Sequence, residues 1–168
     1  ADARSDADCA MVLAKLDRLD VLVTAAGIVR RDDEHGLEVF RDVVDVNLTG
    51  TARFAFNARA PLAASRGSIV TIASMLSYFG DRRVPAYAAS KAGAIHLTAT
   101  LAQAWAHKGI RVNGVAPGLV DTKLTKVTIS NEERLRERLD GIPANRLGTP
   151  DDMAGACLIQ WAVGQTLT

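Results

Sequence analysis

Three short apolar runs divide the chain and predict β-strands. Each run is rich in β-branched residues, is almost continuously apolar and ends in small or turn-forming residues. The predicted strands cover residues 20–24, 68–73 and 110–116. This pattern is typical of parallel strands that are covered on both faces, because such strands have no side turned to solvent.

Longer segments with helical patterning surround these strands and are too long to be hairpin turns. The predicted helices cover residues 6–19, 37–64, 86–107, 131–139 and 151–163. Asp6 or Asp8 is expected near the N-cap of the first helix, and Pro150 opens the last. Strands that alternate with helices predict an α/β fold, a Rossmann-like, doubly wound parallel sheet with helices on both faces.

Length and composition indicate one globular domain over residues 1–168, with 48% hydrophobic and 23% charged residues. The net charge of +1 gives no reason to expect nucleic acid or an anionic membrane surface as a partner. No apolar run is long enough to span a bilayer, and the first residues lack a signal-peptide core. Cys9 and Cys157 have no metal-ligand spacing around them, so we expect buried free thiols, no metal site and a cytoplasmic location.

Residues with possible chemistry follow the predicted strands. Ligands of open parallel sheets bind beyond the carboxyl ends of the strands. The first strand runs into Ala25-Ala26-Gly27, whose small side chains allow a flat ligand to approach the backbone. The second strand ends at Ser74, and the third ends at the rigid turn Pro117-Gly118.

Tyr87 and Lys91 lie at i,i+4 spacing near the start of a predicted helix, so they share one face. A nearby ammonium group and the helix N-terminus both favour the phenolate, and we expect them to lower the pKa of Tyr87. Ser74 is placed to hydrogen-bond a substrate oxygen. These groups suit general acid/base chemistry on an alcohol or ketone. Taken singly, however, Ser74 reads as a strand-end cap, and Asn47 as a polar helix residue with a local partner.

Together these residues resemble the classical short-chain dehydrogenase/reductase family. Thr24-Ala25-Ala26-Gly27 is similar to the family's N-N-A-G turn, and Asp45-Val46-Asn47-Leu48 to the segment with its active-site Asn. The run Tyr87-Ala88-Ala89-Ser90-Lys91 resembles Y-x-x-S-K, with Ser74 at the family's spacing before it. Residues 111–122 resemble R-V-N-x-x-x-P-G-x-x-x-T.

The resemblance implies a nicotinamide-dependent oxidoreductase that acts on a small alcohol or ketone with NAD or NADP. It implies that Tyr87 is the acid/base, that Lys91 lowers its pKa and holds the nicotinamide ribose, and that Ser74 orients the substrate oxygen. Asn47 would position a water that links Lys91 to solvent. The other implied cofactor-binding residues are Asp2, Ala25, Ala26, Gly27, Pro117, Gly118, Val120 and Thr122.

The chain departs from the family pattern at its ends. The opening strand and its T-G-x-x-x-G-x-G loop, which holds the cofactor pyrophosphate, are absent. Residues 161–168 are similar to the run into the last strand, but the V-D-G-G that follows in the family is missing. The alternatives are a partial record of a longer polypeptide and a truncated homologue; we favour the partial record, because a sheet without its central strand exposes an apolar edge.

The substrate is left open between several classes. Residues 27–31 and 72–78 resemble the sugar-acid branch of the family, which includes 2-deoxy-D-gluconate 3-dehydrogenase and 2-dehydro-3-deoxy-D-gluconate 5-dehydrogenase. A basic cluster of Arg30, Arg31, Arg82 and Arg83 could bind a substrate carboxylate, or could be solvated surface. The alternatives are a 3-oxoacyl-(acyl carrier protein) reductase and, in another class, a non-catalytic Rossmann-like binding or scaffold protein.

Alanine-rich faces on the predicted helices 37–64 and 86–107 suggest close helix packing. The family pairs these two helices across a dimer interface, so the resemblance implies a homotetramer. Packing of the same alanines against the sheet is the alternative.

Overall fold

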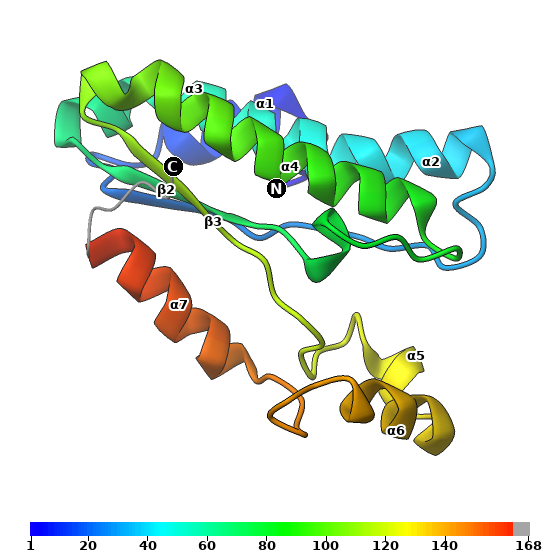
Figure 1. Ribbon diagram of the computed structural model, residues 1–168. Helices are drawn as coiled ribbons and strands as arrows, with labels where there is room; N and C mark the ends of the chain where they lie inside the picture. The colour runs from blue at the N-terminus through cyan, green and yellow to red at the C-terminus, as the bar shows by residue number, and fades with distance from the viewer. Residues whose placement is uncertain (163–168) are drawn as a thin grey trace.

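A parallel sheet with helices on both faces organises the computed structural model, which describes residues 1–162 (Figure 1). The strands are β1 (Val21–Thr24), β2 (Ser68–Ile72) and β3 (Arg111–Val115). The α-helices are α1 (Asp6–Leu13), α2 (Leu37–Val44), α3 (Gly50–Ser65), α4 (Pro85–Trp105), α5 (Lys126–Ile129), α6 (Glu132–Asp140) and α7 (Pro150–Ala162). Most of the run predicted to lead into a last strand, residues 163–168, lies outside the described residues.

The strands pair in the order β1-β2-β3, and both pairings are parallel. Val21 of β1 is opposite Ser68 of β2, which is in turn opposite Arg111 of β3. Helices α3 and α4 cover one face of the sheet, and α7 packs on β2 and β3 from the other (Figure 1). The predicted Rossmann-like α/β fold is therefore confirmed.

The main core lies between the sheet and the helices α3 and α4. Ile69 of β2 and Val112 of β3 meet Leu62 of α3 and Trp105 of α4 there, and all four side chains are buried. Because β2 is the central strand, its residues are covered on both sides, which explains its unbroken apolar run. Among the described residues, no helix is both long and apolar enough to cross a membrane.

The predicted helix 37–64 is interrupted in the structure. Its backbone widens into a π-helical turn at Asp45–Thr49, between α2 and α3, with Gly50 N donating to the Asp45 carbonyl. Wide turns of this kind are rare and often occur at functional sites. Here the turn carries Asn47, whose side chain is completely buried.

Two other helix predictions need correction. The first helix ends at Leu13 and not near Leu19, whereas Asp6 lies near the N-cap as predicted, directly after the cap residue Ser5. Ser5 has the extended backbone of a cap, and its hydroxyl accepts from Asp8 N at 3.1 Å. The short helix α5 was not predicted. Of the two cysteines, Cys9 is buried as expected and Cys157 is only half-buried.

Gly67 connects α3 to β2 where the chain crosses the start of β1. A Cβ at this position would lie 2.5 Å from the Asp20 carbonyl oxygen, which Ser68 N already binds at 2.9 Å. We expect Gly67→Ala to destabilise the fold by about 1–3 kcal/mol, because anchored backbone cannot move aside. Chemical denaturation measures the change. The control is Gly155→Ala on α7, where nothing lies within 4 Å, and a similar loss in both variants would contradict the prediction.

Candidate active site

Ser74 and Tyr87 line one pocket of about 420 Å³ beyond the carboxyl ends of the strands. Ser74 is the second residue after the end of β2, and Tyr87 lies in the first turn of α4. The same pocket is lined by Gly118 and Val120, from the loop after β3. The structure therefore brings together side chains from three chain segments that the sequence separates.

The Tyr87 phenol is largely enclosed, and burial raises its pKa. A hydrogen bond with Ser74 and the positive charge of Arg31 act in the opposite direction, and Glu34 adds to the increase. This result differs from the sequence-based expectation of a lowered pKa. Burial outweighs the favourable neighbours, so the pKa of the Tyr87 phenol lies above its ordinary value.

Lys91 lies one helical turn after Tyr87, with its ammonium nitrogen 5.8 Å from the centre of the Tyr87 ring. Its side chain is 5% exposed and donates to the Ile72 carbonyl oxygen at the end of β2, at 2.6 Å. Burial lowers the pKa of Lys91 to about 8. The lysine is thus a cation held at some energetic cost beside the phenol.

Asn47 connects the π-helical turn to the loop after β1 and to α4. Its side-chain oxygen accepts from Ile28 N at 2.8 Å, and its side-chain nitrogen donates to the Ile28 carbonyl at 2.9 Å. The same nitrogen donates to the Ser90 hydroxyl at 3.1 Å, and Ser90 donates in turn to the Tyr87 carbonyl. Asn47 therefore fixes the loop after β1 against the face of α4 that carries Ser90.

Small exposed residues border the Asn47–Lys91 region. Ala25, Ala26 and Gly27 are exposed after β1, and a Cβ on Gly27 would lie 3.6 Å from the Lys91 nitrogen. Gly118 has open space around its Cα. Exposed backbone with no side chains in the way suits the close approach of a flat, polar group such as a dinucleotide.

Three further residues that were predicted to bind the cofactor make their hydrogen bonds within the chain. Asp2 is exposed and paired with Arg4 at 2.8 Å, which lowers the pKa of its carboxyl to about 2. It does not line the small pocket beside Thr24, Ala25 and Ala26. Thr122 braces the loop after β3, where its N–H donates to the Thr125 hydroxyl at 3.0 Å. Pro117 accepts from Met75 N through its carbonyl oxygen at 2.8 Å, which joins this loop to the end of β2.

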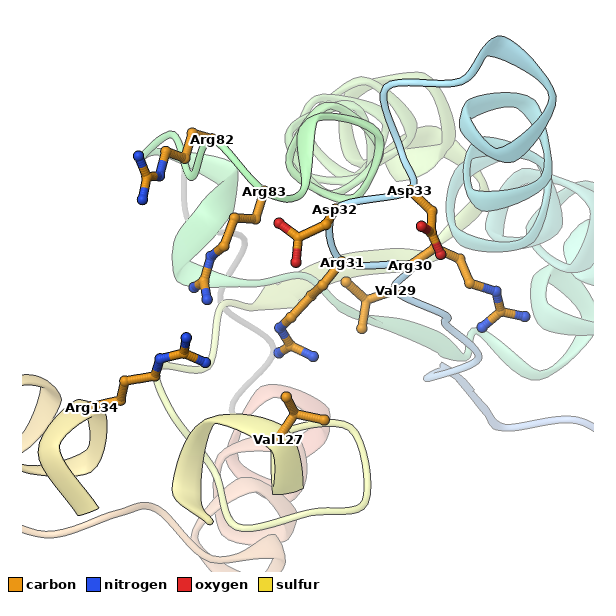
Figure 2. A pocket seen from close by; sticks show the side chains of 9 residues that line it. All are labelled: Val29, Arg30, Arg31, Asp32, Asp33, Arg82, Arg83, Val127 and Arg134. Carbon is orange, nitrogen blue, oxygen red and sulfur yellow. The ribbon is translucent and has the colours of Figure 1, made fainter. Parts of the chain in front are cut away.

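The basic cluster is only partly assembled. In Figure 2 the guanidinium groups of Arg31, Arg83 and Arg134 are directed toward the same space, whereas those of Arg30 and Arg82 point away from it. This space has a volume of about 720 Å³ and shares Arg31 and Arg83 with the pocket of Ser74 and Tyr87. Arg83 is paired with Asp81 at 3.1 Å. Arg31 donates to the Leu124 carbonyl, and no salt bridge joins it to a carboxylate within residues 1–162.

A family comparison identifies the chain. Residues 1–160 match a profile described as enoyl-(acyl carrier protein) reductase. The chain belongs to the short-chain dehydrogenase/reductase family. Among curated members, the 2-dehydro-3-deoxy-D-gluconate 5-dehydrogenase of Escherichia coli (strain K12) is 39% identical over 147 residues. The match covers 85% of this chain and 58% of that enzyme, so the chain spans little more than half the length of this relative.

Solved structures of this short-chain dehydrogenase/reductase family agree with the fold. A protein from Beutenbergia cavernae, proposed to be an NAD(P)-dependent gluconate 5-dehydrogenase and crystallised with NADP, is 41% identical with a TM-score of 0.89. A gluconate 5-dehydrogenase from Burkholderia cenocepacia, in complex with NADP and tartrate, is 28% identical with a TM-score of 0.90. Each match covers 96% of this chain, and 67% and 66% of the respective relative.

Sequence reasoning missed one buried member of the site. Glu34 is 1% exposed and accepts from the backbone of Tyr87, although it follows the charged run Arg30-Arg31-Asp32-Asp33. A run of charges normally indicates a solvated surface, so nothing in the composition distinguishes Glu34 from its neighbours. Ser90, which the Y-x-x-S-K run already contains, donates through its hydroxyl to the Tyr87 carbonyl.

Proposed function

We propose that this chain carries the catalytic part of an NAD(P)-dependent dehydrogenase that interconverts a secondary alcohol and a ketone on a sugar acid. The observation that carries the proposal is Arg31, a half-buried cation that lines the same pocket as Ser74 and Tyr87. In the part of the chain that the structure describes, no acidic side chain neutralises it by a salt bridge. A cation in this position favours a substrate with a carboxylate.

In the proposed reaction Tyr87 exchanges a proton with the substrate oxygen. During oxidation the phenolate takes the hydroxyl proton while the carbon gives up its hydride, and reduction reverses both transfers. Ser74 hydrogen-bonds the substrate oxygen, and Lys91 stabilises negative charge on the phenol. A bound nicotinamide cofactor supplies the hydride acceptor or donor.

The residues present fit such a cofactor. We assign Ala25, Ala26 and Gly27 to contacts near its adenosine ribose and Lys91 to its nicotinamide ribose. The nicotinamide end would contact the loop after β3, namely Pro117, Gly118, Val120 and Thr122. The exposed small residues at both loops support this assignment. Asp2 has the weakest support as an adenine contact, because its carboxylate is occupied by Arg4. Asn47 is proposed to position a water that links Lys91 to solvent.

The named relatives support the substrate class. Both the Escherichia coli and the Burkholderia cenocepacia enzymes are named for the oxidation of sugar acids, and the latter was crystallised with tartrate, a dicarboxylate. We therefore favour a sugar acid over a neutral polyol. The same comparison supports NADP as a cofactor to test first.

Replacement of Arg31 tests the proposal. We expect Arg31→Gln to raise KM for a sugar acid about 10- to 100-fold, the loss expected for one hydrogen-bonded charge pair. KM for a neutral polyol should change little. The measurement is nicotinamide absorbance with substrates of both kinds, in the full-length protein.

Arg30→Gln is the matched control, because Arg30 is adjacent in sequence and does not line the pocket of Ser74 and Tyr87. Equal losses for charged and neutral substrates in Arg31→Gln would contradict the assignment of Arg31. Absence of nicotinamide oxidation or reduction with all sugar acids, polyols and ketoacyl thioesters would contradict the enzyme itself.

The assembly and location are proposals of the same kind. We propose one Rossmann-type domain, a homotetramer and a cytoplasmic location. The exposed residues Phe56 on α3, Ala99 on α4 and Ala106 directly after α4 support a helix-paired interface. Ala55, Ala58 and Ala102 are buried inside the chain, so the alanine pattern supports the interface only in part.

A further inference from the structure

Glu34 is a buried acid that the proposed reaction does not use. Its side chain is 1% exposed, and its contacts are with backbone N–H groups. One carboxylate oxygen accepts from Arg30 N at 2.9 Å, and the other accepts from Tyr87 N at 2.8 Å. Burial of a carboxylate is costly unless it is well hydrogen-bonded. The presence of a buried acid at this position therefore requires an explanation, which its two hydrogen-bond partners suggest.

The contact with Tyr87 supplies a cap that α4 lacks. Val84, at the cap position, makes no side-chain hydrogen bond to the helix, and Pro85 has no N–H to offer. The N–H of Tyr87 is among the first-turn donors that have no acceptor inside a helix. Glu34 accepts this hydrogen bond from a loop that is 53 residues away in sequence.

The contact with Arg30 closes the turn that carries Arg31. Asp33 N donates to the Arg30 carbonyl at 3.1 Å, and Asp32 has a positive φ of 69°, a conformation that non-glycine residues seldom adopt. The Glu34 carboxylate bonds back onto Arg30 N across the same turn. The direction of the Arg31 side chain toward the pocket therefore depends on this closed turn.

Further contacts join the turn to the segment before α4. Asp32 N donates to the Arg83 carbonyl at 2.9 Å, and the His35 ring lies 2.9 Å from the Arg82 carbonyl. These contacts hold the two segments side by side but do not reach Tyr87. Only the Glu34 carboxylate, among the hydrogen bonds of the described residues, bonds both to this turn and to Tyr87.

We infer that Glu34 is a positioning residue whose carboxylate fixes the turn carrying Arg31 against the helix turn carrying Tyr87. The inference rests on the proposed function of Arg31 and Tyr87. One acid then sets the distance between the group that binds the substrate carboxylate and the group that moves the proton.

Glu34→Gln removes the charge and one of the two acceptor oxygens while keeping the shape. We expect kcat for a sugar acid to fall and KM to rise, each by about 10-fold or more, since misplacement of reacting groups by a fraction of an ångström has effects of this size. Glu38→Gln is the control, because Glu38 is exposed on α2. A merely structural role would reduce the folded fraction and leave KM unchanged.

The pH profile gives a second readout. The charged groups that face the Tyr87 phenol are Glu34, Arg31 and Lys91, and Glu34 raises the pKa of the phenol. In alcohol oxidation Tyr87 must first lose its proton, so its pKa sets the acidic limb of the profile, and loss of the Glu34 charge should move that limb to lower pH. Glu34→Asp keeps the charge but is too short to reach both N–H groups, so it should lower kcat with the limb unmoved. If Glu34→Gln fails to fold, Glu34→Asp still tests whether the Glu34 carboxylate positions Tyr87 and Arg31.

Backbone hydrogen exchange, followed by mass spectrometry, tests the inference without activity. We expect faster exchange in residues 28–36 and 85–88 of Glu34→Gln than in the wild type. Unchanged exchange, or wild-type kcat, KM and pH profile in both Glu34 variants, would overturn the inference. If the wild type is inactive but Glu34→Gln still exchanges faster than the wild type in these residues, the result would count against the proposed function alone.

Discussion

Tyr87→Phe is expected to reduce kcat about 100- to 10,000-fold, the range that general acid/base catalysis contributes. Only the phenolic hydroxyl is removed. The ring still contacts Lys91, and the backbone N–H of Tyr87 still donates to Glu34, so the fold should be retained. The measurement is the steady-state rate of nicotinamide oxidation or reduction, together with the thermal unfolding midpoint.

Tyr78→Phe provides a matched control for this prediction. Tyr78 is the other tyrosine of the chain, is 65% exposed and lies outside the residues that line the pocket. Its replacement should leave kcat unchanged. A Tyr87→Phe variant with wild-type kcat would remove Tyr87 from the proton transfer and leave the acid/base unassigned.

Lys91→Met should lower kcat about 100-fold or more, as the loss of a buried group that stabilises developing charge does in other enzymes. Methionine fills a similar volume but has no charge to place beside the phenol. The exposed Lys15 gives the control, Lys15→Met, for which we expect no change in rate. Rates equal to the wild type in Lys91→Met would contradict the assigned role.

The same variant should change how stability depends on pH. The pKa of Lys91 is about 8 in the folded chain against 10.5 for an unperturbed lysine. Between these values the unfolded chain binds more protons than the folded chain, so the free energy of unfolding gains a contribution that increases with pH. Lys91→Met lacks this contribution. Denaturation of both proteins across the window measures the difference, and identical pH slopes would contradict the burial of a titrating Lys91.

The strands and most of the helices were predictable because their signals are local. A short apolar run that ends in a glycine or a serine specifies a buried parallel strand, and β2 has the predicted start and ends one residue early. The π-helical turn was not predictable in this way. It changes which carbonyl each N–H contacts, and residues 45–49 have no composition that distinguishes such a turn from an α-helix.

The proximity of Tyr87 and Lys91 was predictable from the sequence, but the electrostatics around them were not. The spacing of Tyr87 and Lys91 correctly places them together, and it suggests that the lysine lowers the pKa of the phenol. The actual direction depends on how completely the phenol is enclosed, which distant segments decide. Glu34 was missed for the same reason, since one of the two contacts of its buried carboxylate is with Tyr87 N in α4, 53 residues further along the chain.

The wide turn at Asp45–Thr49 has a consequence for the helices on either side of it. A π-helical turn holds one residue more than an α-helical turn, so it rotates all that follows by about 100°. Val43 of α2 and Ala55 of α3 are both buried, although they lie on opposite sides of this offset. Val43 and Ala55 are twelve residues apart, which in a regular α-helix would place them about 120° apart, and the extra residue brings their faces back into line. A change that regularised the turn without removing a residue would therefore turn the core-facing side of α3 toward solvent, whereas deletion of one residue would keep the two faces aligned and remove the turn that carries Asn47.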